Sequence, residues 1–237
     1  MSTSPYHQFC PVAMAAEVLC CRWTLLLVRE LMLGSVRFND LRRGVPRMSS
    51  ALLAKRLKEL EAAGIVRRTR AARESDPHEY HLTAAGQELR PIVEAVGVWG
   101  QRWVTTEATL RHLDANLLMW DIRRHVNPAP LPEGRTTVQF IFRDCPPPQR
   151  NYWLIAQPGQ PVDLCTEDPG FDVDLYVATD LRCMTEVWLG YTSVAQARES
   201  RRLELTGDRT LQAQLRDWLG LSAFAAVPKQ QMAPAAA

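Results

Sequence analysis

Two lysines on one predicted helix form the first cluster of residues suited to binding a polyanion. Lys55 and Lys58 lie in a segment with helical hydrophobic spacing. On a wheel at about 100° per residue they share one side with Ala51 and Ala54. The opposite side carries Leu52, Leu53, Leu57 and Leu60. A helix with lysines and small residues outside can enter the major groove of DNA, which is roughly 12 Å wide.

Arginines follow directly in a predicted β-hairpin. Strand alternation over residues 65–70 sends Arg68 and Arg70 to one face and Arg67 to the other, and Arg73 lies at the tip. A charged hairpin can simply be solvated, but this one follows a helix with a basic outer side, which favours contacts to phosphates or the minor groove. The predicted DNA contacts are Arg37, Ser49, Ser50, Ala51, Lys55, Lys58, Arg68, Arg70 and Arg73.

Arg56 is the exception among these basic residues. It falls within the leucine arc of the helix, so we expect it either to extend along apolar surface with its charge in water or to pair with an acid such as Glu30 or Asp40. We therefore do not expect Arg56 to contact DNA.

The elements that must position these side chains follow a recognisable order. Residues 11–33 predict two short helices, and residues 38–43 predict a third. Ser49 or Ser50 caps the next helix, which runs over residues 51–63 and stops at Gly64. Residues 65–70 and 79–82 predict the hairpin, and Thr83 caps a last helix over about residues 85–103. This order is typical of a winged helix-turn-helix domain.

Five blocks in register resemble the HxlR-type transcriptional regulators: residues 10–12 (CPV), 22–25 (RWTL), 37–41 (RFNDL), 57–66 (LKELEAAGIV) and 79–86 (EYHLTAAG). The resemblance covers about residues 9–105. It implies a homodimer that binds a pseudo-palindromic site in double-stranded DNA as a repressor or an activator. It also implies a dimer interface made by the first and last helices, and the residues expected there are Val12, Val93, Val96, Trp99 and Trp103.

Cys10 is the cysteine with a possible regulatory role among the six of the chain. In some members of the family that this chain resembles, a cysteine before proline near the N-terminus senses oxidants or aldehydes, and the beginning of a helix can lower a thiol pKa. The alternative is a packed thiol near the dimer interface. Cys20 and Cys21 lie in an apolar helical region and are expected in the core. The cysteines show no zinc-ligand spacing, so we expect no metal site.

Charge and composition divide the chain into two halves. The 237 residues are 46% hydrophobic and 23% charged, as in globular proteins. Residues 1–112 carry 16 basic and 11 acidic residues, whereas residues 113–237 carry 12 and 15. No apolar run approaches the ~20 residues of a membrane span, and the N-terminus does not resemble a secretory signal. We expect a cytoplasmic protein that does not bind membranes.

The fold class predicted is α+β in two domains. Residues 1–112 form the winged helix domain, residues 113–134 a helix end with a Pro-rich linker, and residues 226–237 a flexible tail. Between them, residues 135–225 carry short β-like segments at 136–142, 152–157, 162–165 and 172–178, then helix, strand and a closing helix capped by Asp208. This pattern predicts an antiparallel sheet packed with helices.

The order of elements from Ala178 to Leu219 resembles the sterol carrier protein type two fold, which implies an apolar tunnel for a hydrophobic small molecule. A strand leads to a helix ending at Gly190, then a second helix, a strand ending at Gly207, and the last helix. The same residues suit a plain core. The predicted pocket residues are Phe140, Phe142, Trp153, Ile155, Leu164, Leu175, Val177, Met184, Trp188 and Tyr191.

The leading hypothesis from the sequence is a DNA-binding transcriptional regulator controlled by an apolar ligand. No nucleophile motif or phosphate-binding loop is present, so we expect neither an enzyme nor a cofactor. Two alternatives remain. One is a regulator that senses oxidants or aldehydes through Cys10, and the other is a lipid carrier whose winged helix only dimerises.

Overall fold

The computed structural model describes residues 6–70 and 78–230, which form two compact units. The first unit ends at Val96 and the second begins at Gly97, so the division falls inside one helix. The sequence analysis ends the first domain at residue 112.

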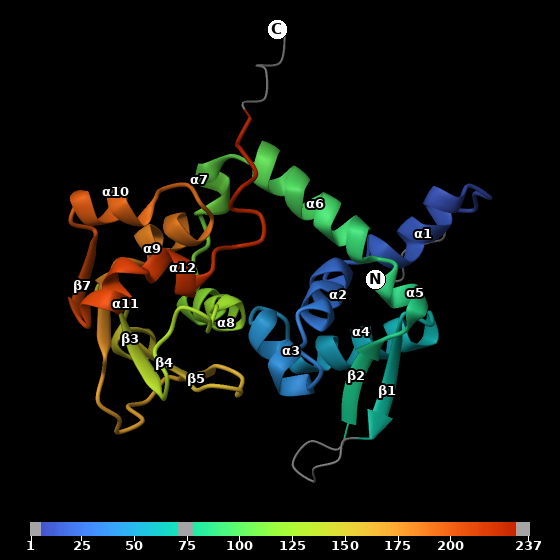
Figure 1. The fold of residues 1–237 in the computed structure, drawn as a ribbon. Helices are drawn as coiled ribbons and strands as arrows, with labels where there is room; N and C mark the ends of the chain where they lie inside the picture. The colour runs from blue at the N-terminus through green and yellow to red at the C-terminus, as the bar shows by residue number, and fades with distance from the viewer. Residues whose placement is uncertain (1–5, 71–77, 231–237) are drawn as a thin grey trace, which may run out of the picture. The chain divides into compact units, whose positions relative to one another are not determined.

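The first unit has the element order predicted for a winged helix (Figure 1). Its helices and strands are α1 (Pro11–Leu19), α2 (Thr24–Met32), α3 (Phe38–Gly44), α4 (Ser50–Ala62), β1 (Val66–Arg70), β2 (His78–Leu82), α5 (Ala84–Gln87) and the first half of α6 (Arg90–Trp103). The Ser49 hydroxyl accepts from the Leu52 N–H at 3.3 Å, so Ser49 and not Ser50 caps α4. At the other end, Gly64 takes φ +71°, a conformation that turns the chain into β1.

One predicted helix is two in the structure. The sequence predicts a single helix over residues 85–103, whereas α5 ends at Gln87 and α6 begins at Arg90. Pro91 explains the break, because it has no N–H to donate to the Gln87 carbonyl and its ring fits only the first turn of a helix. Thr83 caps α5 as predicted, accepting from the Gly86 N–H at 3.1 Å.

Leucines and valines from α2, α3, α4 and the hairpin form the core of the first unit. Its buried members are Leu27, Val28, Leu31, Leu41, Val45, Met48, Leu53, Leu57, Leu60, Ile65, Val66 and Leu82. A fully buried acid, Glu30, joins this core and pairs with Arg29 at 2.6 Å and with the Ser35 hydroxyl at 3.3 Å. Gly44 makes room for it, since a Cβ there would lie 1.9 Å from the Glu30 carboxylate.

The second unit packs helices on a five-stranded sheet. After α6 come α7 (Thr106–Thr109), α8 (Ala115–His125), β3 (Thr136–Phe142), the 3-10 turn η1 (Pro147–Gln149), β4 (Asn151–Ala156), β5 (Asp163–Cys165), β6 (Leu175–Thr179), α9 (Leu181–Trp188), α10 (Val194–Glu199), β7 (Leu203–Gly207), α11 (Arg209–Ala213) and α12 (Leu215–Leu219). Helix α8 lies in the segment that the sequence analysis assigned to a helix end and linker, and it contributes Leu118, Met119 and Ile122 to this unit's core.

The sheet is mixed, so the prediction of an antiparallel sheet is wrong for one strand pair. The strand order is β5-β4-β3-β6-β7, and β3 runs parallel to β6, with Val138 opposite Leu175. The other neighbours are antiparallel. The chain leaves β5 and crosses through residues 166–174 to the far side of β3, where it enters in the same direction. Strand patterning reveals the strands but not this crossing.

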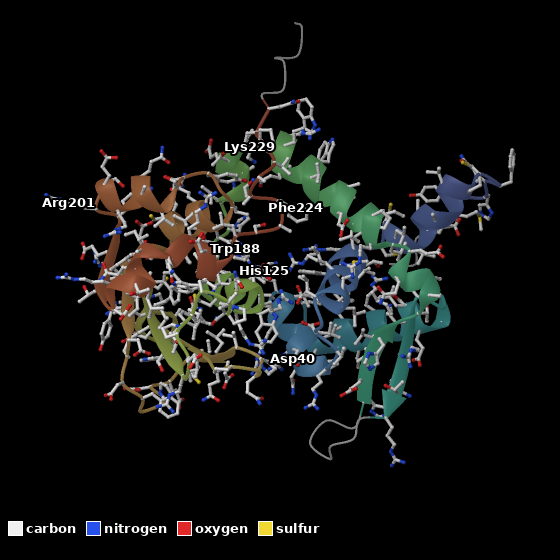
Figure 2. The ribbon with its side chains drawn as sticks, in the orientation of Figure 1. Asp40, His125, Trp188, Arg201, Phe224 and Lys229 are labelled. Carbon is white, nitrogen blue, oxygen red and sulfur yellow. The ribbon has the colours of Figure 1, made fainter. Side chains whose placement is uncertain are left out.

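One face of the sheet is buried beneath α8, α9, α11 and α12 (Figure 1). Alternate residues of β3, β4 and β6 face these helices, and they include Phe140, Phe142, Tyr152, Leu154 and Val177. The ring of His125 meets that of Trp188 edge to face at 5.0 Å (Figure 2). Apolar burial on this scale is the main stabilising term of such a unit.

The predicted closing helix is also two helices. Asp208 caps α11 as predicted, accepting from the Leu211 N–H at 2.8 Å, but the helix ends at Ala213. The Trp218 indole donates to the Leu211 carbonyl at 2.9 Å, which is the acceptor that a continuous helix would offer to Leu215. Leu211, Leu215, Trp218 and Leu219 all lie in the core.

Gly86 tests the joint between the hairpin and α5. We expect Gly86→Ala to destabilise the first unit by about 1–3 kcal/mol, because the added Cβ would lie 2.3 Å from the Ile65 carbonyl oxygen. Gly100→Ala in α6 is the control: a Cβ there meets nothing within 4 Å, and removing a helical glycine stabilises by up to about 1 kcal/mol. Urea unfolding followed by circular dichroism measures both. Equal effects would contradict the close approach.

Candidate nucleic-acid interface

Helix α4 presents its two lysines to solvent because its opposite side is held in the core. Leu53, Leu57 and Leu60 are at most 2% exposed. Lys55 has 67% of its side chain exposed, and Lys58 is exposed as well. Ser50 and Ala51, at the beginning of the same helix, are exposed too. A convex helical surface with two exposed ammonium groups matches what the major groove of a duplex admits.

The β1–β2 hairpin lies beside α4 (Figure 1). It adds guanidinium groups to this part of the first unit. In the β1–β2 register, Arg68 lies opposite Tyr80 and Arg70 opposite His78, so both arginines share one face and Arg67 lies on the other, as predicted. Arg68 and Arg70 are exposed. Arg73, the third arginine predicted to contact DNA here, lies outside the described residues.

Arg37 binds the hairpin instead of standing free. Its guanidinium lies 3.7 Å from the Glu79 carboxylate, and its backbone forms a β-bridge with the same residue. One third of its side chain stays exposed. The role of Arg37 in DNA contact therefore remains a prediction, with a structural role beside it.

The expected partners of Arg56 are wrong. Arg56 is 17% exposed and pairs with Glu59 of its own helix at 2.5 Å, whereas Arg29 pairs with Glu30 and Arg43 with Asp40. Spacing explains this outcome, because residues three apart on a helix are neighbours, so Arg56 pairs with Glu59 and not with an acid of another helix. Glu59 also lies 4.0 Å from Lys55 and so faces two cations.

An apolar stripe on α6 and residues of α1 lie open to solvent. Val12 is 76% exposed, Val96 50% and Trp99 60%, whereas Val93 packs partly on the core and Trp103 is half-buried. Phe9, Met14 and Ile92 are exposed as well and are absent from the set predicted from the sequence. Ile92 could have been found, since it lies four positions before Val96 on the same side of the helix.

Cys10 directly precedes α1, and a thiol at the beginning of a helix is expected to have a lowered pKa. The backbone of Ala13, and then that of Val12, lowers the pKa of the Cys10 thiol below its ordinary value. Burial instead raises the pKa of the Cys145 and Cys183 thiols. Cys20 is exposed and Cys21 half-buried, so the expectation that both lie in the core is wrong.

The predicted ligand-pocket residues of the second unit fall into two groups. Five of them are fully buried in the core between the sheet and the helices: Phe140, Phe142, Leu175, Val177 and Met184. Trp188 lies in the same core and is 5% exposed. Trp153 and Ile155 point to the other face of the sheet and are 7% exposed, while Leu164 packs partly on the core.

Tyr191 lines a cavity of about 440 Å³ in this unit. Val187, Val194, Leu221 and small residues of the C-terminal segment form its walls, and Arg216 is its charged member. The Tyr191 hydroxyl donates to the Gln101 side chain at 3.1 Å, and Gln101 in turn donates to the Leu189 carbonyl at 2.9 Å.

Metal sites and membrane-spanning helices are two further classes of feature to consider in the described residues. Within residues 6–70 and 78–230, no group of three His, Cys, Asp or Glu side chains is placed to hold a metal ion. No single helix in these ranges has the length and apolar composition to cross a membrane. Helices α1 and α2 taken together meet both criteria, but a bend of 79° separates them.

A winged helix with a basic, solvent-facing fourth helix places the first unit among helix-turn-helix proteins. The family model for HxlR-like helix-turn-helix proteins matches residues 18–108. The uncharacterized HTH-type transcriptional regulator YvaP of Bacillus subtilis is 36% identical over 98 residues, which are 41% of this chain and 91% of YvaP. YybR of the same organism is 36% identical, over 41% of this chain and 78% of YybR. The chain belongs to the HxlR-like helix-turn-helix family.

Solved structures give matches over the same part of the chain. The redox regulator HypR in its reduced form is 36% identical with a TM-score of 0.37, over 39% of this chain and 91% of HypR. The reduced transcriptional regulator YodB from B. subtilis is 33% identical with a TM-score of 0.35, over 40% of this chain and 93% of YodB.

Proposed function

We propose that this chain, a transcriptional regulator of the HxlR type, binds double-stranded DNA with the outer side of α4 and the β1–β2 hairpin. The observation that carries the proposal is the exposure of Lys55 and Lys58 opposite a fully buried leucine side. Specific recognition would come from Ser50 and Ala51 near base edges, the lysines would reach phosphates or base edges, and Arg68 and Arg70 would hold the backbone.

The charge distribution supports this proposal. Residues 35–80 carry 11 basic and 6 acidic residues, so the whole excess of +5 in the first 112 residues lies in the elements assigned to DNA. Arg68 and Arg70 have no ion-pair partner within the described ranges, which leaves their charge available for phosphates. Residues 113–237 carry a net charge of −3, which disfavours a second DNA surface there.

A homodimer is the assembly that the apolar side chains of α1 and α6 favour. Val12, Ile92, Val96 and Trp99 expose apolar surface that a monomer would leave in water. A two-fold dimer buries the same side chains on both copies. It would present two α4 helices to half-sites about one helical turn apart, or a multiple of that spacing, and so read a pseudo-palindromic sequence.

A hydrophobic small molecule in the second unit is proposed as the effector. Supporting it are the likeness in element order to the sterol carrier fold, the apolar residues between sheet and helices, and the cavity beside Tyr191. The large share of fully buried side chains favours a ligand that enters at the Tyr191 cavity over one that fills a wide tunnel. A lipid carrier whose winged helix only dimerises is the alternative.

A thiol switch at Cys10 is the second candidate for control. It is favoured by the lowered pKa of that thiol at the beginning of α1, next to the apolar side chains assigned to the dimer. Reaction of Cys10 with an electrophile would then alter the dimer contact and, through it, the spacing of the two α4 helices.

We expect Lys55→Ala with Lys58→Ala to weaken DNA binding roughly tenfold at 0.1 M salt. The slope of log affinity against log salt should also fall by about two, because two phosphate contacts are lost. Fluorescence anisotropy of a labelled 30-base-pair duplex of arbitrary sequence measures both, since non-specific binding needs no operator.

Lys229→Ala is the matched control for the double variant. Lys229 bonds the Val104 carbonyl at 2.6 Å and lies 4.7 Å from the centre of the Tyr191 ring (Figure 2), so its loss should leave the salt slope unchanged. Unaltered binding by the double variant would contradict the assignment of α4. If charge reversal at Arg68 and Arg70 leaves the function of the protein in the cell intact, the lipid-carrier alternative is favoured instead.

Native mass spectrometry of the purified chain should report a dimer, with additional mass if an apolar ligand is retained. Trp99→Ala should raise the dissociation constant of the dimer at least tenfold, because a large apolar contact is removed. Glu94→Ala, a charged residue of the same helix, is the control. A wild-type monomer would contradict the dimer, and a dimer that takes up no added fatty acid would contradict the ligand.

The rate of Cys10 alkylation by iodoacetamide should rise with pH through a midpoint below the ordinary thiol pKa of about 8.5, because only the thiolate reacts. Peptide mass spectrometry follows the rate, and the buried Cys183 should stay unmodified in the folded protein. If Cys10 is the switch, alkylation changes DNA binding by the wild type and not by Cys10→Ser. An equal response in both removes this candidate.

A further inference from the structure

A groove of the first unit lies between the α1–α2 corner and α4, and Lys55 is the one lining residue that the function proposed above uses. It has a volume of about 840 Å³. We call it the α1–α4 groove and define it by its lining residues: Glu17, Val18, Cys20, Cys21, Arg22, Trp23, Thr24, Leu52, Lys55, Arg56, Glu59, Leu60 and Ala63. Its walls are mostly apolar, and its three basic residues outnumber its two acids.

Two polar side chains of this groove have hydrogen-bonding atoms without a partner. Thr24 is 1% exposed, and its hydroxyl has no hydrogen-bond partner among the described residues. The Nε–H of Arg56 is buried and equally unpartnered there, although another nitrogen of that guanidinium pairs with Glu59. Buried polar atoms are nearly always satisfied, and an unpartnered one costs about 1–3 kcal/mol. Both donors come from residues that line the same groove.

Trp23 and Arg22 add an aromatic ring and a cation to the lining of the groove. Trp23 precedes α2 with φ +79°, a left-handed conformation that is strained for a bulky side chain. The Arg22 guanidinium lies 5.2 Å from the centre of its ring. A rigid aromatic group and a cation therefore line the groove beside the two unpartnered donors.

We propose that the α1–α4 groove binds a small aromatic carboxylate. A carboxylate has only acceptors to offer, so it would accept from the Thr24 hydroxyl and the Arg56 Nε–H once a small shift of the lining side chains exposes these two buried atoms. The aromatic body packs on Trp23, Leu52 and Leu60. The net positive lining favours an anion over a neutral or cationic ligand.

Binding there would reach the DNA-contacting side of α4 through one carboxylate. Glu59 pairs with Arg56 at 2.5 Å and lies 4.0 Å from Lys55. A ligand carboxylate on Arg56 competes for that pairing and leaves Glu59 to neutralise Lys55, which weakens the contact to phosphate. This consequence rests on the proposed DNA binding, whereas the binding of the carboxylate does not.

Isothermal titration of the full chain with 1-naphthoate, in the absence of DNA, tests the proposal. We expect binding at least tenfold tighter than that of 1-naphthamide, which has the same shape without the charge. Arg56→Met should weaken the affinity tenfold or more, and Thr24→Val, which removes only the hydroxyl, two- to tenfold. Arg42→Met is the matched control, because Arg42 is exposed on α3 and does not line the groove.

Cysteine protection gives a readout that locates the ligand. Bound 1-naphthoate should slow the reaction of Cys20 with N-ethylmaleimide and leave that of Cys10 unchanged, since Cys20 lines the groove and Cys10 does not. Circular dichroism verifies that each variant is folded. Absence of binding at millimolar 1-naphthoate, or an equal loss in Arg42→Met, would overturn the proposal. A groove filled by a second copy of the chain would also overturn the proposal. In that case Thr24→Val and Arg56→Met shift the dimer equilibrium, and 1-naphthoate does not bind.

Discussion

Burial of one leucine side of α4 is the constraint on which the first unit depends. Leu53, Leu57 and Leu60 can leave water only if the helix packs on α2, α3 and the base of the hairpin. The same packing fixes the direction of the opposite side, so Lys55 and Lys58 must point outward. Stability and the presentation of charge are thus two results of one amphipathic pattern.

Most of the first unit could be predicted because its signals are local. Hydrophobic spacing, the Ser49 cap and Gly64 determine α4 from neighbouring residues alone. The second unit was predicted less completely. The parallel pairing of β3 with β6 depends on the path of the chain through residues 166–174. The hydrophobic pattern of either strand does not show which strand pairs with it.

The candidate site shows the same limit. The exposure of Lys55, Arg68 and Arg70 follows from periodicity, which the sequence displays directly. The partner of Arg56 does not, since Glu30, Asp40 and Glu59 are all acids within plausible reach and only packing selects among them. The α1–α4 groove was invisible for a related reason, because it joins residues about 40 positions apart whose polar atoms appear ordinary until their missing partners are counted.

The exposed first turn of α4 has an evolutionary consequence. Ser50 and Ala51 contribute nothing to the buried core, and surface substitutions of this kind usually change stability by less than about 0.5 kcal/mol. Under the proposed function, these positions lie where bases are read. Duplicated copies of such a gene could therefore acquire new target sequences by single substitutions while keeping their fold, which allows one scaffold to diversify into many regulators.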